Sequence, residues 1–126
     1  MMTTTESMVK NLVDTFEKDG LQVIQANCTG FENPTTIEGV EPDVICWNPN
    51  KELYHIGVVA DSQTISSDLT KQKILTLSKL MMGRGSSEGE RLPFVIGVPP
   101  EASNEADKTF QENEIQSQGN AQKIVL

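Results

Sequence analysis

The chain has 126 residues, of which 10 are basic and 18 acidic, and its formal net charge is −8. That length suits one modest core, so we expect a single domain over residues 1–126. The acidic balance disfavours tight, non-specific DNA binding, which gains affinity from Lys and Arg against phosphates. No apolar run is long enough to span a bilayer, and the first residues, MMTTTESMVK, lack a secretory signal. We therefore expect a cytoplasmic protein without a membrane partner.

The first half of the chain predicts one helix and three strands. Apolar residues recur at spacings of three and four over residues 5–19, which is typical of an amphipathic helix. Strands are expected over residues 21–28, 43–47 and 52–61, and a Pro-containing turn over 48–51 makes the last two a hairpin. Cys28 and Cys46 lie in these strands, where a reducing compartment favours buried free thiols.

The second half alternates helices and strands. Ser66 or Ser67, followed by Asp68, is a suitable start for a helix that runs through residue 82. A flexible loop over 83–90, an apolar strand over 92–98, an acid-rich helix over 103–118 and a last strand over 121–126 follow. The order α-β-β-β-α-β-α-β indicates an α/β fold, a mixed sheet of about five strands with helices on both faces. The residues expected in its core include Phe16, Val44, Ile56, Leu77 and Ile96.

A Pro-Asp pair, Pro42-Asp43, stands at the head of the second predicted strand. With this order of elements, the chain resembles the restriction-endonuclease-like superfamily, the PD-(D/E)xK phosphodiesterases, which includes archaeal Holliday junction resolvases. The resemblance implies a site where two carboxylates hold Mg²⁺ and a nearby lysine orients the attacking water. In the family, the second carboxylate and the lysine stand two residues apart on the third strand, which places both on one face.

The third predicted strand offers two registers for those positions. In the first, Val58 and Ala60 stand where active relatives often have Glu and Lys, so both catalytic side chains would be absent. In the second, Asp61 is the second carboxylate, and Gln63 replaces the lysine on the same face. Glutamine can position a water molecule but contributes no charge. Asp61 is otherwise a polar residue that ends the strand and begins a loop.

Two other groups extend the candidate site. Glu6, in the first helix, matches a place where the family often has an acidic residue, and it would join Asp43 and Asp61 as a metal ligand. Its alternative role is that of a solvated acid that suits the helix dipole. Lys71 and Lys73 lie early in the second helix, where the lysine is found in some relatives. Either could replace the missing lysine, and the alternative is an exposed surface lysine.

The sequence leaves three functions open. The first is a nuclease fold with a degraded site, which acts as a non-catalytic binding or accessory subunit for a nucleic acid or protein partner. The second is a Mg²⁺-dependent DNA endonuclease that uses Asp43, Asp61 and Gln63. The third is an α/β interaction module unrelated to nucleases. The apolar last strand and the acidic third helix favour self-association, so a homodimer is a further expectation. His55 and Trp47 are expected to be a structural imidazole and a core residue.

Overall fold

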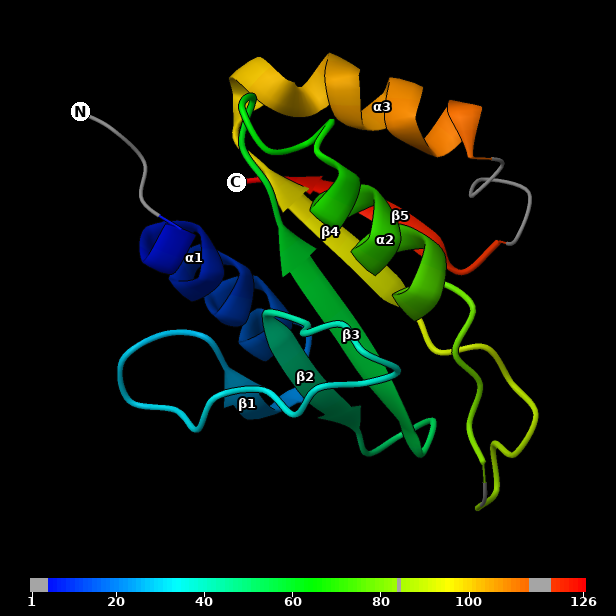
Figure 1. Cartoon of the computed structure of the whole chain (residues 1–126). Coiled ribbons are helices and arrows are strands. Elements are labelled where there is room, and N and C mark those ends of the chain that lie inside the picture. Colours follow the sequence, from blue (N-terminus) through cyan, green and yellow to red (C-terminus); the bar gives the residue numbers. More distant parts are fainter. Residues whose placement is uncertain (1–4, 84, 114–118) are drawn as a thin grey trace.

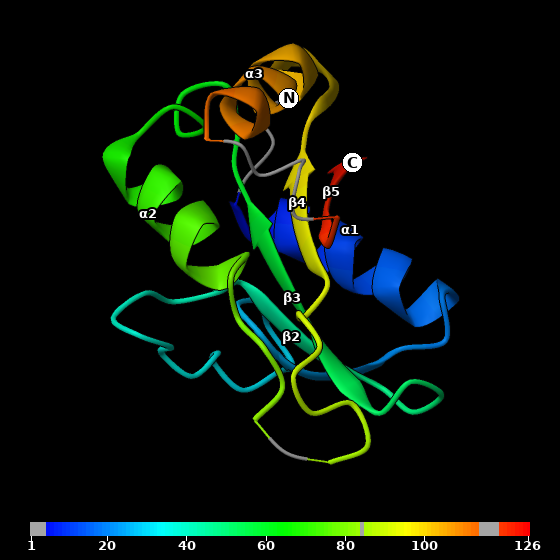
Figure 2. The same cartoon turned by 90° about the vertical axis from the view of Figure 1, so that its right-hand side faces the viewer.

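The computed structural model describes residues 5–83, 85–113 and 119–126. A five-stranded mixed sheet, in the order β1-β2-β3-β4-β5, lies between α1 on one face and α2 and α3 on the other (Figures 1 and 2). The strands are β1 (Gln22–Ala26), β2 (Val44–Asn48), β3 (Leu53–Val59), β4 (Phe94–Val98) and β5 (Ala121–Val125). The helices are α1 (Thr5–Lys18), α2 (Asp68–Leu77) and α3 (Ser103–Glu112), with a 3₁₀ turn over Pro100–Ala102. The expected α/β class and five-stranded mixed sheet are confirmed.

Strand direction changes in the middle of the sheet. β1, β2 and β3 are antiparallel neighbours, whereas β3, β4 and β5 are parallel. The two parallel connections pass through α2 and α3 and move in the same direction across the sheet. Crossovers of one hand therefore place both helices on one face, and the opposite face is left for α1.

Each face of the sheet has its own apolar cluster. Against α1, the sheet contributes Val44, Cys46, Val59 and Val95, and the helix contributes Met8, Val9, Leu12, Val13 and Phe16. Against α2 and α3, the sheet contributes residues such as Ile45, Ile56, Val58 and Ile96. Alternation along β2 and β3 thus assigns neighbouring residues to opposite faces. All five residues expected in the core are buried: Phe16, Val44, Ile56, Leu77 and Ile96.

Two strands are shorter than expected at their carboxyl ends. β1 ends at Ala26, whose N–H donates to the carbonyl of Glu32 as the chain enters a loop. Cys28 therefore lies beyond the strand and is half-buried, so the prediction of a buried strand thiol is wrong for it; Cys46 is fully buried, as expected. β3 ends at Val59, two residues before the expected end at Asp61.

The second helix also ends early. Ser67 caps its start by accepting a hydrogen bond from the Thr70 N–H, but the helix ends at Leu77 instead of residue 82. Residues 80–82 instead run beside residues 90–92, and the Leu92 N–H donates to the carbonyl of Leu80 at 2.9 Å. The buried stripe of the helix is Thr70, Ile74 and Leu77, and Leu69 beside it is 60% exposed.

The third helix ends at Glu112, and residues 114–118 of its expected extent lie outside the described residues. Trp47, expected in the core, is only half-buried and lines a hollow together with Tyr54 and Met82. His55 is half-buried, and its Nε2 lies 3.3 Å from the side-chain nitrogen of Asn48. Burial is the main cause that lowers the pKa of His55, as expected for a structural imidazole.

Candidate functional site

Asp43 lies one residue before β2, beside the end of β1. Its N–H donates to the carbonyl of Gly57 at 2.9 Å, and its own carbonyl accepts from the Asn27 N–H at 2.8 Å. The pairing of Val44 with Gly57, continued by one residue, places Asp43 opposite Val58. These backbone hydrogen bonds hold Asp43 between the two neighbouring strands.

The Asp43 carboxylate is buried, with the residue only 5% exposed. Its Oδ2 accepts a hydrogen bond from the Val59 N–H at 2.8 Å. Desolvation raises the pKa of Asp43, and the hydrogen bond from Val59, the charge of Lys73 and a hydrogen bond from the Asn27 side chain oppose that rise. Desolvation is the largest of these effects, so the carboxyl group holds its proton more tightly than an exposed aspartate would.

The face that Asp43 shares with β3 is apolar. Val58 and Ala60 are each 1% exposed and belong to the cluster packed against α2 and α3. These are the positions that would hold the second carboxylate and the lysine in the first register. The side chains of valine and alanine supply no oxygen for a divalent cation and no charge for a water molecule. The donor set around Asp43 therefore does not fit the Mg²⁺ site that the family resemblance implies.

Asp61 and Gln63, the pair of the second register, lie in a turn and not on a strand. Asp61 Oδ1 accepts from the N–H groups of Gln63 and Thr64, both at 2.9 Å, and from Thr64 Oγ1 at 3.1 Å. The expectation that the two residues share a strand face is wrong, because Asp61 forms a side-chain-to-backbone turn that ends the strand. The Gln63 side chain is exposed.

The structure separates the two candidate lysines. Lys73 is half-buried on α2 and is close enough to Asp43 for its charge to lower the pKa of that carboxyl group. Lys71 is exposed and lines a hollow of about 230 Å³ between α2 and α3. Of the two lysines, Lys73 is the one whose charge acts on Asp43.

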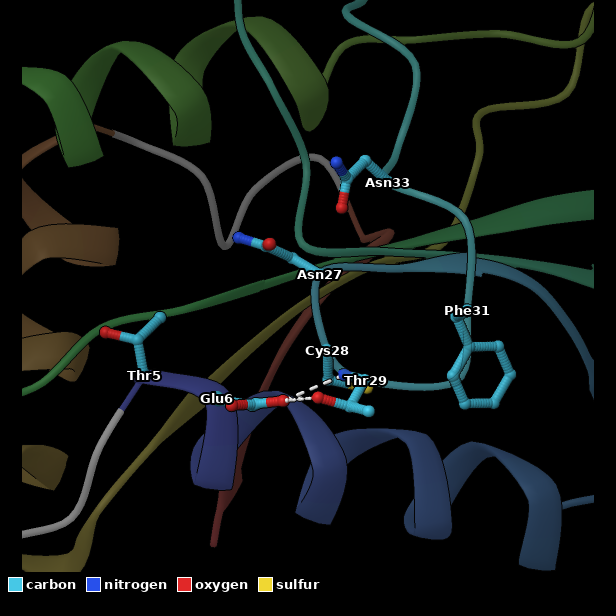
Figure 3. Close-up of a pocket in the computed structure, with 7 residues that line it drawn as sticks. All are labelled: Thr5, Glu6, Asn27, Cys28, Thr29, Phe31 and Asn33. Carbon is cyan, nitrogen blue, oxygen red and sulfur yellow. Dashed lines mark hydrogen bonds between the residues drawn. The ribbon is translucent and has the colours of Figure 1, made fainter.

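Glu6 reaches from the first turn of α1 to the loop that follows β1 (Figure 3). Its Oε1 accepts from the Thr29 N–H at 2.8 Å and also from the Thr29 hydroxyl. The hydrogen bonds from Thr29 lower the pKa of Glu6. An open hollow of about 540 Å³ lies here, lined by Thr5, Glu6, Asn27, Cys28, Thr29, Phe31 and Asn33.

Asn27 links the two acidic groups, and sequence reasoning missed it. Its backbone and side chain contact Asp43, and it lies two residues before Thr29, the partner of Glu6. The available signal was topological, since the residue that follows β1 must lie beside the residue that precedes its antiparallel partner β2. In the described part of the chain, no group of three or more His, Cys, Asp or Glu residues could hold a metal ion.

Comparisons with known proteins give no relative by which to judge this arrangement: no model of a protein family, no curated protein and no solved structure matches the chain significantly. The helices described in the structure include none with the length and apolar character needed to cross a bilayer.

Proposed function

We propose that this chain is a nuclease-fold protein of the PD-(D/E)xK type whose catalytic site is degraded, and that it acts as a non-catalytic binding or accessory subunit. One observation supports this most directly. Asp43 lies opposite Val58, and Val58 and Ala60 are buried in the core at the positions where the family chemistry requires a carboxylate and a lysine.

Phosphodiester hydrolysis by this route needs a cation held by converging oxygen ligands, and a positive group near the attacking water. Asp43 is one such ligand, but its Oδ2 is already bonded to the Val59 N–H. The carboxylate of Asp61 is bonded within its own turn. Loss of one preorganised stabilising group typically costs about 10²–10³ in rate. The net charge of −8 also repels a polyanionic substrate.

One observation favours a second candidate, a Mg²⁺-dependent DNA endonuclease. Lys73 lies on α2 close enough to Asp43 to influence its pKa, so a positive charge is present near the first carboxylate. In this alternative, Asp43 and Asp61 would bind the metal, and Lys73 or Gln63 would position the water. Metal binding would require the Asp61 turn to release its carboxylate.

A cleavage assay separates the two candidates. Supercoiled plasmid, single-stranded DNA and a four-way junction are incubated at neutral pH with Mg²⁺ or Mn²⁺, and an active nuclease serves as the assay control. We expect no metal-dependent cleavage by the wild-type protein. Calorimetric titration with Mn²⁺ should give the same result for the wild-type protein and for Asp43→Asn. Neither should show a heat of binding that depends on Asp43.

The variants define the opposite outcome. Metal-dependent cleavage that disappears in Asp43→Asn and Asp61→Asn, with circular dichroism unchanged, would overturn the proposal in favour of the endonuclease. Lys73→Gln and Lys71→Gln form a matched pair, since both remove one charge from α2 and only Lys73 lies near Asp43. Activity lost in the first and kept in the second would assign the lysine's role to Lys73.

A further inference from the structure

A third hollow lies at the other end of β2, away from Asp43. Asp43 precedes Val44 and Trp47 lies near the end of the strand, so the two are separated by about 13 Å along the chain direction. The hollow has a volume of about 310 Å³ and is lined by Trp47, Glu52, Tyr54, Met82, Gly85 and Ser86. Its lining residues come from the β2–β3 hairpin and from the segment after α2.

Two aromatic rings form one side of this hollow. Trp47 and Tyr54 are cross-strand partners in the β2–β3 pairing, with ring centroids 4.9 Å apart and ring planes at 64°. Trp47 is half-buried and Tyr54 is 39% exposed. Rings inclined in this way present surfaces in two directions, and the negative face of an aromatic ring attracts a cation.

A carboxylate forms another side. Glu52 adopts a left-handed backbone conformation with φ of 55°, which places it in the turn between the strands. Its Oε2 accepts a hydrogen bond from the Ser86 hydroxyl, and the neighbouring Ser87 hydroxyl donates to the carbonyl of Lys51. These two bonds connect the hairpin turn to the 85–87 segment, so both walls are positioned before any ligand arrives. Preorganisation of this kind lowers the entropic cost of binding.

We propose that this hollow binds an arginine or lysine side chain from a basic segment of a partner protein. Aromatic surfaces beside a carboxylate are suited to a guanidinium or ammonium group. The net charge of −8 attracts a basic partner, repels nucleic acid phosphates and opposes contact with a second copy of this chain. The inference deepens the proposed accessory role by naming the chemistry of its partner, and it rests on that role for its biological meaning.

Trp47 is the only tryptophan in the chain, so its fluorescence reports on the hollow directly. The probe is a capped five-residue peptide with two arginines, and its control is the same peptide with citrulline, a neutral isostere of arginine. We expect saturable change in fluorescence with the arginine peptide and none with the citrulline peptide. Single-stranded oligothymidylate tests the nucleic acid alternative.

Matched variants test the carboxylate and the ring. Glu52→Gln should weaken binding of the arginine peptide by about 2- to 30-fold, the range expected for loss of one favourable contact to a cation. Glu88→Gln removes the same charge from an exposed residue outside the hollow and should have little effect. Tyr54→Leu should weaken binding to a similar degree, whereas Tyr54→Phe, which keeps the ring, should retain it. Circular dichroism establishes that each variant is folded.

Several results would overturn the proposal. These are equal binding of the arginine and citrulline peptides, equal effects of Glu52→Gln and Glu88→Gln, absence of binding, or a response to oligothymidylate alone. The outcome is distinguishable from that of the cleavage assay. Cleavage that requires Asp43 would reject the accessory role without changing the peptide result, and absent peptide binding would leave the degraded site as it is.

Discussion

Replacing Gly57 with alanine tests how closely α1 packs on the sheet next to Asp43. A Cβ atom at this position would lie 2.8 Å from Leu12 Cδ2, 3.0 Å from Phe16 Cε2 and 3.3 Å from Phe16 Cζ. The optimal separation between carbon atoms is about 3.5–4.0 Å. Leu12 and Phe16 are 0% and 2% exposed, so neither side chain can move outward into solvent without disturbing the core.

The magnitude follows from two opposing effects. Extra volume in a packed core costs about 1–3 kcal/mol. Alanine also restricts the unfolded chain relative to glycine, which returns about 0.4–1 kcal/mol at a compatible position. We therefore expect Gly57→Ala to lower the free energy of unfolding by roughly 0–2.6 kcal/mol. Urea denaturation followed by Trp47 fluorescence measures this, with an unchanged m-value.

Two further variants make the test specific. Gly83→Ala is the matched control, because a Cβ there would meet nothing within 4 Å, and its effect should be within about 0.5 kcal/mol. Phe16→Leu removes one of the two obstructing side chains, so Gly57→Ala should cost less in that background, with a coupling energy of about 0.5–2 kcal/mol. If Gly57→Ala is stabilising, or shows no coupling to Phe16, the proposed close contact with α1 is wrong.

Two other predictions concern titratable groups. The pKa of Asp43 is raised from 3.8, so the folded state binds this proton more tightly than the unfolded state does. Wild-type stability should therefore fall as pH rises from about 4 through the folded pKa. Asp43→Asn should remove that fall when urea unfolding is measured across this pH range. The pKa of Glu6 is lowered from 4.5, so its contribution to stability is present above that pH and is lost as pH decreases. Glu6→Gln should remove this contribution. Identical pH profiles of stability for Asp43→Asn and Glu6→Gln would contradict both assignments. A thiol reagent should label Cys28 in the folded protein and Cys46 only on unfolding, because Cys46 is 0% exposed and burial raises its pKa to about 12; equal labelling rates would contradict the burial of Cys46.

The sequence predicted the fold well wherever local patterns were strong. The spacing of Val9, Leu12 and Phe16 located α1, and Pro49 located the turn between β2 and β3. The ends of elements were predicted less well, because they depend on contacts that are distant in sequence. α2 ends early where Leu80 bonds to Leu92, a partner that no pattern around residue 80 indicates.

The candidate site was predictable only in part. The Pro42-Asp43 pair identified the buried carboxylate, but its contacts depend on which loop lies beside it, and Asn27 was therefore missed. Lys71 and Lys73 could not be distinguished from sequence, since the rotation of α2 about its axis decides which of them is half-buried and which is exposed. That rotation is set by the buried stripe of Thr70, Ile74 and Leu77. Asp61 was assigned to a strand because, in the sequence, a polar residue directly after an apolar strand can be the end of that strand or the start of a turn. The structure shows the turn, in which Asp61 accepts a hydrogen bond from the Thr64 N–H.

The placement of α1 has a consequence for the order in which the protein matures. Phe16 and its neighbours on α1 share a cluster with Val95 of β4, which is joined to them only after most of the chain has been synthesised. Part of the apolar stripe of α1 can pack on Val44, Cys46 and Val59 as the hairpin emerges from the ribosome, but its contact with Val95 must await β4. Closing so long a loop is slow relative to local helix and hairpin formation. Until β4 is in place, the part of the α1 stripe that later packs against Val95 lacks that partner.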